Sequence, residues 1–245
     1  MILIAIFQLT LIVLVHELGH YFFARLAGVQ VLSFNIGFGP ALITRKYNGT
    51  EYVLRLFPLG GYVRLAGLDE SQRKIPKNKT FPAQSLLKRF SIILGGALGN
   101  FLFTWLIFYV FIVLNKKAFW TGLVGSFFAL LALLKDILQG IVLLITHTGW
   151  TELSGPLGIF AASAVSAKQG LAAFWLFAAV LSANLGIFNL LPLPGLDGGR
   201  LMFLLYELIL RRKPNPNLEG WVHSIGFILL LWLIVLVSFQ DVARL

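Results

Sequence analysis

Four stretches of about 20 apolar residues constrain this chain more than any other feature of its sequence. They comprise residues 2–26, 90–114, 171–191 and 221–239. A helix rises about 1.5 Å per residue, so about 20 residues cross the ~30 Å hydrocarbon core of a bilayer. Only 12% of the 245 residues are charged, whereas soluble domains carry about 25%. The sequence therefore predicts an all-α, multi-pass membrane protein with four transmembrane helices.

A fifth apolar stretch, residues 123–145, carries Lys135 and Asp136 near its middle. A charge at the centre of a membrane helix costs about 2.5–3.5 kcal/mol, which argues against a span. We expect an amphipathic helix that lies in the membrane interface on the periplasmic side. Its buried stripe is predicted to consist of Leu131, Leu134, Leu138, Ile141 and Ile145.

The distribution of basic residues predicts the orientation of the chain. Between the first two spans, the acidic residues are Glu51, Asp69 and Glu70, and the basic residues are Arg45, Lys46, Arg55, Arg64, Arg73, Lys74, Lys77, Lys79, Lys88 and Arg89. By the positive-inside rule this loop is cytoplasmic, which puts the N-terminus on the periplasmic side. A second basic cluster at residues 211–213 is then also cytoplasmic. Topology and lipid headgroups thus account for the net charge of +10, and we expect membrane lipids but no nucleic acid as partners.

The cytoplasmic loop has the pattern of β structure. Residues 41–56 contain two β-prone runs around Asn48-Gly49, a dipeptide typical of tight hairpin turns. A further strand is expected at residues 61–65. The loop is therefore predicted to form a small cytoplasmic β-hairpin or sheet.

The first span contains the segment His16-Glu17-Leu18-Gly19-His20. Positions i and i+4 share one face of a helix, so both imidazoles can bind one metal ion, while Glu17 can take a proton from water. The chain has no cysteine, which excludes thiolate ligands and disulfides. The spacing predicts a Zn²⁺ site with His16 and His20 as ligands and Glu17 as the catalytic carboxylate.

A catalytic zinc ion usually has a third protein ligand. Asp197 is the best candidate, because two prolines and several glycines interrupt the apolar segment around it. His16 lies about 14 Å along a helix from Arg25, and Asp197 at most about 21 Å from Arg211, so both fall in the cytoplasmic half of the membrane. The alternative is that Asp197 only caps the next helix. His147 and His223 are interpreted as interfacial or helix-end residues rather than ligands.

These features resemble the site-2 protease family of intramembrane zinc metalloproteases, most closely its bacterial regulator of sigma-E protease group. The resemblance covers nearly the whole chain. It rests on HELGH at residues 16–20, GFGP at 37–40, PLGGYV at 58–63, GALGNF at 96–101, SGPLG at 154–158 and NLLPLPGLDGG at 189–199.

The resemblance implies that His16, His20 and Asp197 bind zinc, that Glu17 is catalytic, and that Asn100 and Asn189 hold substrate. An asparagine in a span can instead bridge helices. The implied activity is hydrolysis of peptide bonds in or near the transmembrane segments of single-span proteins, such as anti-sigma-factor-like proteins or remnant signal peptides. The implied location is the bacterial inner membrane, with an upstream site-1-type protease as a candidate partner.

The resemblance also implies one intramembrane metalloprotease domain over residues 1–245. The sequence departs from this group in one respect: only residues 115–118 separate the second span from the amphipathic stretch, where the group usually carries one or two PDZ domains, so we expect no PDZ domain here. The expected parts of the metalloprotease domain are span 1 (1–26), the cytoplasmic β-rich loop (27–89), span 2 (90–114), a periplasmic-side amphipathic segment (115–169), span 3 with the broken segment (170–210) and span 4 (219–240).

Two other functions remain alternatives. A metal or ion transporter could use the histidines and Asp197 as a midplane site. It would leave the position of Glu17 between two histidines unexplained, and no repeated halves are visible in the sequence. An inactive pseudoprotease scaffold is the other alternative, although every residue of the HELGH motif is present.

Overall fold

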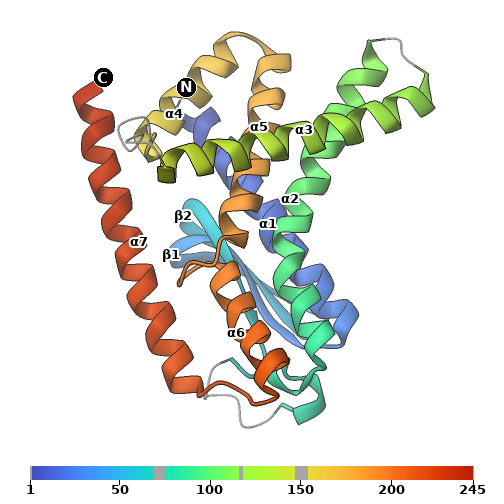
Figure 1. Ribbon diagram of the computed structural model, residues 1–245, viewed down its shortest axis with the longest axis vertical. Helices are drawn as coiled ribbons and strands as arrows, with labels where there is room; N and C mark the ends of the chain where they lie inside the picture. The colour runs from blue at the N-terminus through green and yellow to red at the C-terminus, as the bar shows by residue number, and fades with distance from the viewer. Residues whose placement is uncertain (1, 69–74, 116–117, 147–153, 245) are drawn as a thin grey trace.

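The computed structural model describes residues 2–68, 75–115, 118–146 and 154–244, and helices dominate it (Figure 1). Its elements are α1 (Ile2–Ala27), β1 (Val31–Tyr47), β2 (Thr50–Leu65), two short 3₁₀ helices (Lys77–Lys79 and Phe81–Ala83), α2 (Leu86–Leu114), α3 (Phe119–Thr146), α4 (Pro156–Lys168), α5 (Leu171–Leu190), α6 (Asp197–Leu210) and α7 (Pro216–Arg244).

Within the described ranges, five helices are long and apolar enough to cross a membrane: α1, α2, α3, α5 and α7. The predicted count of four omitted α3. In Figure 1, α3 runs across the upper ends of α2 and α5 and packs against both. In the stripe predicted to be buried in the membrane interface, Leu131, Leu138 and Ile145 are 44%, 51% and 71% exposed on the protein surface, whereas Leu134 and Ile141 are partly buried. The residues that α3 buries are Gly122, Ser126 and Leu130.

The helix boundaries otherwise follow the apolar pattern, with two differences. The region predicted as one broken span, residues 170–210, forms two separate helices, α5 and α6, joined by residues 191–196. The segment that follows α3 contains a helix that was not predicted, α4. His147 lies outside the described residues.

The β strands form the small sheet expected from the sequence, and the turn at Asn48-Gly49 is confirmed. Tyr47 pairs with Thr50, and both turn residues have positive φ, 47° and 76°. The segment Ser33 to Ile36 is matched with residues 51–54 and also with residues 61–64, because both strands bend. Residues 61–65, predicted as a further strand, are the last part of β2.

The sheet lies alongside α1 rather than beyond its cytoplasmic end. At one end the Arg25 guanidinium donates to the carbonyl oxygen of Asn48, and at the other the Thr10 hydroxyl donates to the carbonyl oxygen of Pro58. Thr10 and Arg25 are about 22 Å apart along the helix axis. The loop predicted to be cytoplasmic therefore extends its sheet to the depth of the helices, where its exposed side chains include Phe38 and Phe57.

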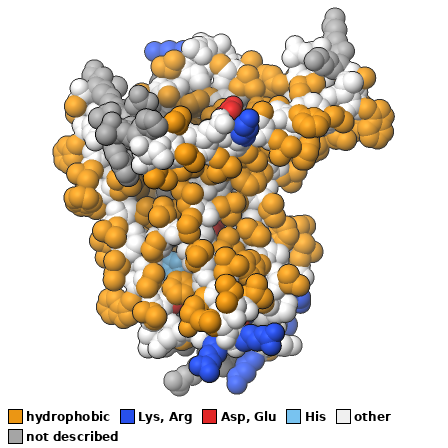
Figure 2. Space-filling model, in the orientation of Figure 1, with side chains coloured by type: hydrophobic (Ala, Val, Ile, Leu, Met, Phe, Trp, Pro, Cys, Tyr) orange, Lys and Arg blue, Asp and Glu red, His pale blue; other side chains and the backbone are white. Residues whose placement is uncertain are grey.

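The outer surface agrees with a membrane setting. Hydrophobic side chains cover most of the face in Figure 2, and Lys and Arg side chains gather at its lower end. That end corresponds in Figure 1 to the loops next to α6 and the start of α2. Such a distribution is typical of a protein whose middle contacts lipid and whose basic end contacts headgroups.

Glycines bring α1 and α2 into close contact. A Cβ atom on Gly19 would lie 2.0 Å from the carbonyl oxygen of Gly95, and one on Gly99 would lie 2.8 Å from that of Val15. Small residues allow helix backbones in membranes to approach closely. The contact places the His16 and His20 face of α1 directly against α2.

Polar contacts fix α6 and α7. Arg89 in α2 forms a double hydrogen bond with Glu207 in α6, at 2.9 and 2.5 Å, and both side chains are nearly buried. Asp241 of α7 accepts hydrogen bonds from the backbone N–H groups of Gly155 and Gly158 at the start of α4, at 3.0 and 2.9 Å. These contacts hold the two C-terminal helices against the rest of the bundle.

Candidate metal centre and active-site pocket

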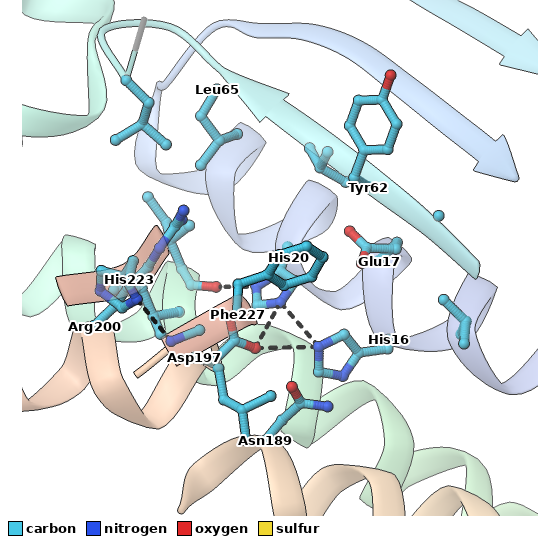
Figure 3. Close-up of a pocket in the computed structure, with 18 of the residues that line it drawn as sticks. His16, Glu17, His20, Tyr62, Leu65, Asn189, Asp197, Arg200, His223 and Phe227 are labelled. Atoms are coloured by element: carbon cyan, nitrogen blue, oxygen red, sulfur yellow. Dashed lines mark hydrogen bonds and ion pairs between the residues drawn. The ribbon is translucent and has the colours of Figure 1, made fainter. Parts of the chain in front are cut away.

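Three side chains predicted to bind metal converge at one point, from α1 and the start of α6 (Figure 3). The Nε2 atoms of His16 and His20 are 3.2 Å apart. Oδ2 of Asp197 lies 3.1 Å from Nε2 of His16 and 3.0 Å from Nε2 of His20. The three atoms thus form a nearly equilateral triangle.

The hydrogen bonds on the far side of each imidazole determine which nitrogen carries the proton. Nδ1 of His16 lies 2.8 Å from Oδ1 of Asn100, and Nδ1 of His20 lies 2.8 Å from the carbonyl oxygen of Ile92. Both partners are acceptors, so each Nδ1 is the donor and each Nε2 of a neutral ring carries a lone pair. Metal-binding histidines usually have this arrangement.

The triangle has the dimensions of a zinc site. Three lone-pair atoms at 3.0–3.2 Å repel one another unless a cation lies among them. Zinc binds histidine nitrogen and carboxylate oxygen at about 2.0–2.2 Å, and tetrahedral geometry then separates the ligand atoms by about 3.3 Å. The residues therefore fit a zinc ion with three protein ligands and a fourth position open to the pocket.

Gly96 of α2 lies directly behind the two imidazoles. A Cβ atom at this position would lie 2.4 Å from Nε2 of His20 and 2.5 Å from Cε1 of His16. Any side chain at position 96 would collide with His16 and His20, so the site requires glycine here.

The loop at residues 191–196 delivers Asp197. Prolines 192 and 194 prevent α5 from continuing, and the loop folds back over the first turn of α6. A Cβ atom on Gly198 would lie 2.0 Å from the carbonyl oxygen of Leu191, and one on Gly199 would lie 2.5 Å from that of Leu193. Asp197 is the first residue of α6, and the N-cap is Leu196 without a side-chain bond. Asp197 therefore does not act as the N-cap of α6, contrary to the alternative considered from the sequence.

A cavity of about 610 Å³ opens next to the three ligand atoms, and Glu17 lines it. The Glu17 carboxylate accepts a hydrogen bond from the backbone N–H of Val63 in β2. Gly61 lies just beside it, since a Cβ atom there would be 3.4 Å from Cγ of Glu17. The last part of β2 therefore forms one wall of the cavity, and Glu17 lies between this wall and the histidines (Figure 3).

The two asparagines predicted to hold substrate occupy different positions. Asn189 lines the cavity near Asp197, and its Nδ2 donates to the carbonyl oxygen of Leu185. Asn100 is fully buried, and its Nδ2 donates to Ser182 and to the carbonyl oxygen of Ile12 while its Oδ1 accepts from His16. Asn100 therefore faces the back of His16 and not the cavity, contrary to the expectation that it holds substrate.

His223 and Arg200 also line the cavity, opposite β2. The sequence interpretation of His223 as an interfacial or helix-end residue did not place it at the cavity. The packing of α7 against the loop before α6 brings it there, and a local sequence pattern does not contain that contact. The available signal in the sequence was a histidine near the start of an apolar segment.

Comparison with protein-family models identifies one match, Peptidase family M50, over residues 4–233. Similar proteins include one from Clostridium perfringens, 29% identical over 98% of both chains, and one from Clostridium acetobutylicum, 26% identical over 98% of this chain and 97% of the relative. Both bear the name putative zinc metalloprotease. Zinc metalloprotease RasP of Geobacillus kaustophilus is 26% identical over 95% of both chains.

The two clostridial relatives are longer than this chain. Their alignments run over 332 and 331 residues, which exceeds the 245 residues of this sequence. They therefore contain segments that have no counterpart here, although the chain covers almost their whole length from end to end.

Proposed function

Because the chain belongs to peptidase family M50, whose site-2 type members are zinc metalloendopeptidases, we propose that it hydrolyses peptide bonds within or near the transmembrane segments of single-span membrane proteins. The observation that carries this proposal is the triangle of His16, His20 and Asp197 with Glu17 beside it, in which both histidines lie on a helix long and apolar enough to cross a membrane. We assign His16, His20 and Asp197 as the zinc ligands and Glu17 as the catalytic carboxylate.

His16, His20 and Asp197 would hold the zinc ion, which would supply Lewis acidity toward the scissile carbonyl group and the attacking water. Glu17 accepts the proton of the attacking water and later passes it to the departing amine. The hydrogen bond from Val63 orients the carboxylate toward the cavity. The Nδ1–H bonds to Asn100 and Ile92 keep both imidazoles in the orientation that presents Nε2 to the metal.

A transmembrane helix hides its carbonyl groups in internal hydrogen bonds, so the substrate must be extended before cleavage. We propose that it adds as a strand to the edge of β2 at residues 61–65. In support, Gly61, Val63 and Leu65 of β2 line the cavity beside Glu17. A sheet edge at membrane depth is costly unless it is paired. Asn189, on the opposite wall, can hold a substrate backbone group with its amide.

We propose the following membrane arrangement. The protein lies in the bacterial inner membrane with its N-terminus on the periplasmic side, and α1, α2, α5 and α7 are the four spans. Helix α3 lies in the periplasmic interface, which its crosswise course in Figure 1 and the charges of Lys135 and Asp136 support. This assignment keeps the basic segments before α2 and after α6 on one side of the membrane.

Candidate substrates are anti-sigma-factor-like proteins and remnant signal peptides, the single-span classes that the resemblance to site-2 proteases implies. An upstream site-1-type protease would supply the former in trimmed form. The alternatives of a transporter or a pseudoprotease are less consistent with a carboxylate, Glu17, that lines the cavity beside the metal ligands without being one of them.

The test is a cleavage assay with purified protein in detergent or vesicles and a model single-span peptide, combined with metal analysis. Cleavage is expected to stop on addition of a zinc chelator and to return with zinc. Asp197→Ala is expected to lose zinc and cleavage together. A full zinc equivalent in folded Asp197→Ala protein would remove Asp197 from the ligand set, and cleavage by the chelated enzyme would refute the proposal.

A further inference from the structure

His223 of α7 contacts the loop that carries Asp197. The backbone N–H of Gly195 donates to Nδ1 of His223 at 3.1 Å. This N–H lies in the loop between α5 and α6, so it has no partner within a helix. Gly195 itself adopts a positive φ of 93°. The hydrogen bond therefore joins the last helix to a point two residues before Asp197.

The surrounding contacts hold the imidazole of His223 in place. Its Cε1 atom would lie 3.2 Å from a Cβ atom on Gly199, and its ring packs at 5.6 Å from the ring of Phe203. Because Nδ1 accepts from Gly195, the neutral ring carries its proton on Nε2. Nε2 is buried and has no hydrogen-bond partner among the described residues. Among the described residues, the bond to the loop is thus the only hydrogen bond of this ring.

The same stretch of α7 presses on the loop one turn later. A Cβ atom on Gly226 would lie 2.3 Å from Cβ of Pro194, and one on Gly195 would lie 2.9 Å from the backbone nitrogen of Phe227. The loop is therefore confined between the first turn of α6 and the backbone of α7. The hydrogen bond to His223 is the directional contact in this packing, and it sets the orientation of the Pro194–Gly195 peptide unit.

We infer that His223 is a positioning residue for the metal centre: by accepting the Gly195 N–H, it fixes the loop that presents Asp197 to His16 and His20. This inference rests on the proposed zinc site. Distances from a metal ion to its ligands fall within about 0.2 Å of their typical values in a formed site, so a movement of the loop that carries Asp197 weakens zinc binding. Hydrogen-bond partners behind metal ligands typically change metal affinity by about 10–100-fold.

Three substitutions separate this role from its alternatives. His223→Asn places an amide oxygen near the position of Nδ1 and can still accept from Gly195. His223→Gln reaches the position of Nε2 but not that of Nδ1. His223→Phe keeps the ring and removes both nitrogens. Ile228→Ala, at a side chain of α7 that is 63% exposed, is the matched control.

The measurement is the zinc dissociation constant of each purified protein, obtained by competition with a chromophoric chelator, together with the melting temperature of the metal-free proteins. We expect H223F and H223Q to bind zinc about 10–100-fold more weakly than wild type. H223N is expected to recover affinity to within about threefold, and Ile228→Ala to match wild type. The metal-free melting temperatures of H223N and H223Q should agree, so that the difference in affinity reflects the loop.

Equal zinc affinity in H223F and wild type would overturn the inference. Recovery by H223Q instead of H223N would also overturn it, because the effect would then depend on Nε2. If H223F does not fold, the comparison of H223N with H223Q still decides. Absence of zinc binding in the wild-type protein would refute the proposed function itself. That result differs from one in which the wild-type protein binds zinc and the His223 variants bind it equally well, which would refute only the role of His223.

Discussion

Gly96→Ala tests whether the metal centre depends on the backbone of α2 behind it. The added methyl carbon would lie 2.4 Å from Nε2 of His20 and 2.5 Å from Cε1 of His16, whereas ordinary contact begins at 3.4 Å. The imidazoles or α2 must therefore move by about 1 Å, several times the ~0.2 Å that a metal site tolerates. We expect zinc affinity to fall at least about 100-fold and cleavage to be lost.

Helix propensity acts in the opposite direction in this variant. Alanine favours a helix over glycine by about 1 kcal/mol, so poor helix formation cannot explain a loss of zinc. Gly140→Ala is the matched control, because no atom lies within 4 Å of a Cβ at that position. The assay is zinc stoichiometry and affinity by competition, with circular dichroism to confirm folding. A Gly96→Ala protein that binds zinc within threefold of wild type would refute the geometry described for the site.

Three further substitutions test the hydrogen bond behind His16 and two ion pairs of different burial. Asn100→Leu removes the acceptor of the His16 Nδ1–H and should weaken zinc binding about 10–100-fold in the same competition assay, with an unchanged affinity as the contradicting result. Arg89→Leu leaves Glu207 without its buried partner and should lower the free energy of unfolding by about 3–5 kcal/mol, measured by denaturant titration. Lys46→Ala breaks the exposed ion pair with Glu51 and should lower the free energy of unfolding by at most about 1 kcal/mol. Equal losses in Arg89→Leu and Lys46→Ala would contradict the burial of the Arg89–Glu207 pair.

The sequence was sufficient where the chemistry is local. HELGH places two imidazoles on one helix face regardless of what surrounds the helix, and Asn48-Gly49 encodes its turn in two residues. Asp197 could be identified because a carboxylate in a broken apolar segment needs a cation. In each case a short-range rule was enough, and the structure brings the three candidate ligands together as expected.

Tertiary contacts decided the remaining features. The depth of the sheet follows from the contact of Thr10 with Pro58, which no composition rule contains. The amide of Asn100 could bind substrate or bridge helices, and only the crossing of α1 and α2 turns it toward His16. His223 reaches Gly195 because glycines let α7 approach the loop closely. The composition of α3 suits a helix in the membrane interface as well as a transmembrane helix. Its sequence alone therefore could not determine the number of transmembrane helices.

The most direct test of the central claim is the effect of Glu17→Gln on zinc and on cleavage in one preparation. Glutamine keeps the shape of the side chain but cannot accept the proton of water, and general-base catalysis contributes about 10²–10⁴-fold to a rate. We expect a full zinc equivalent, as in wild type, and cleavage of the model transmembrane peptide at least about 100-fold slower. Cleavage within tenfold of wild type by the zinc-loaded Glu17→Gln protein would contradict the account of the site.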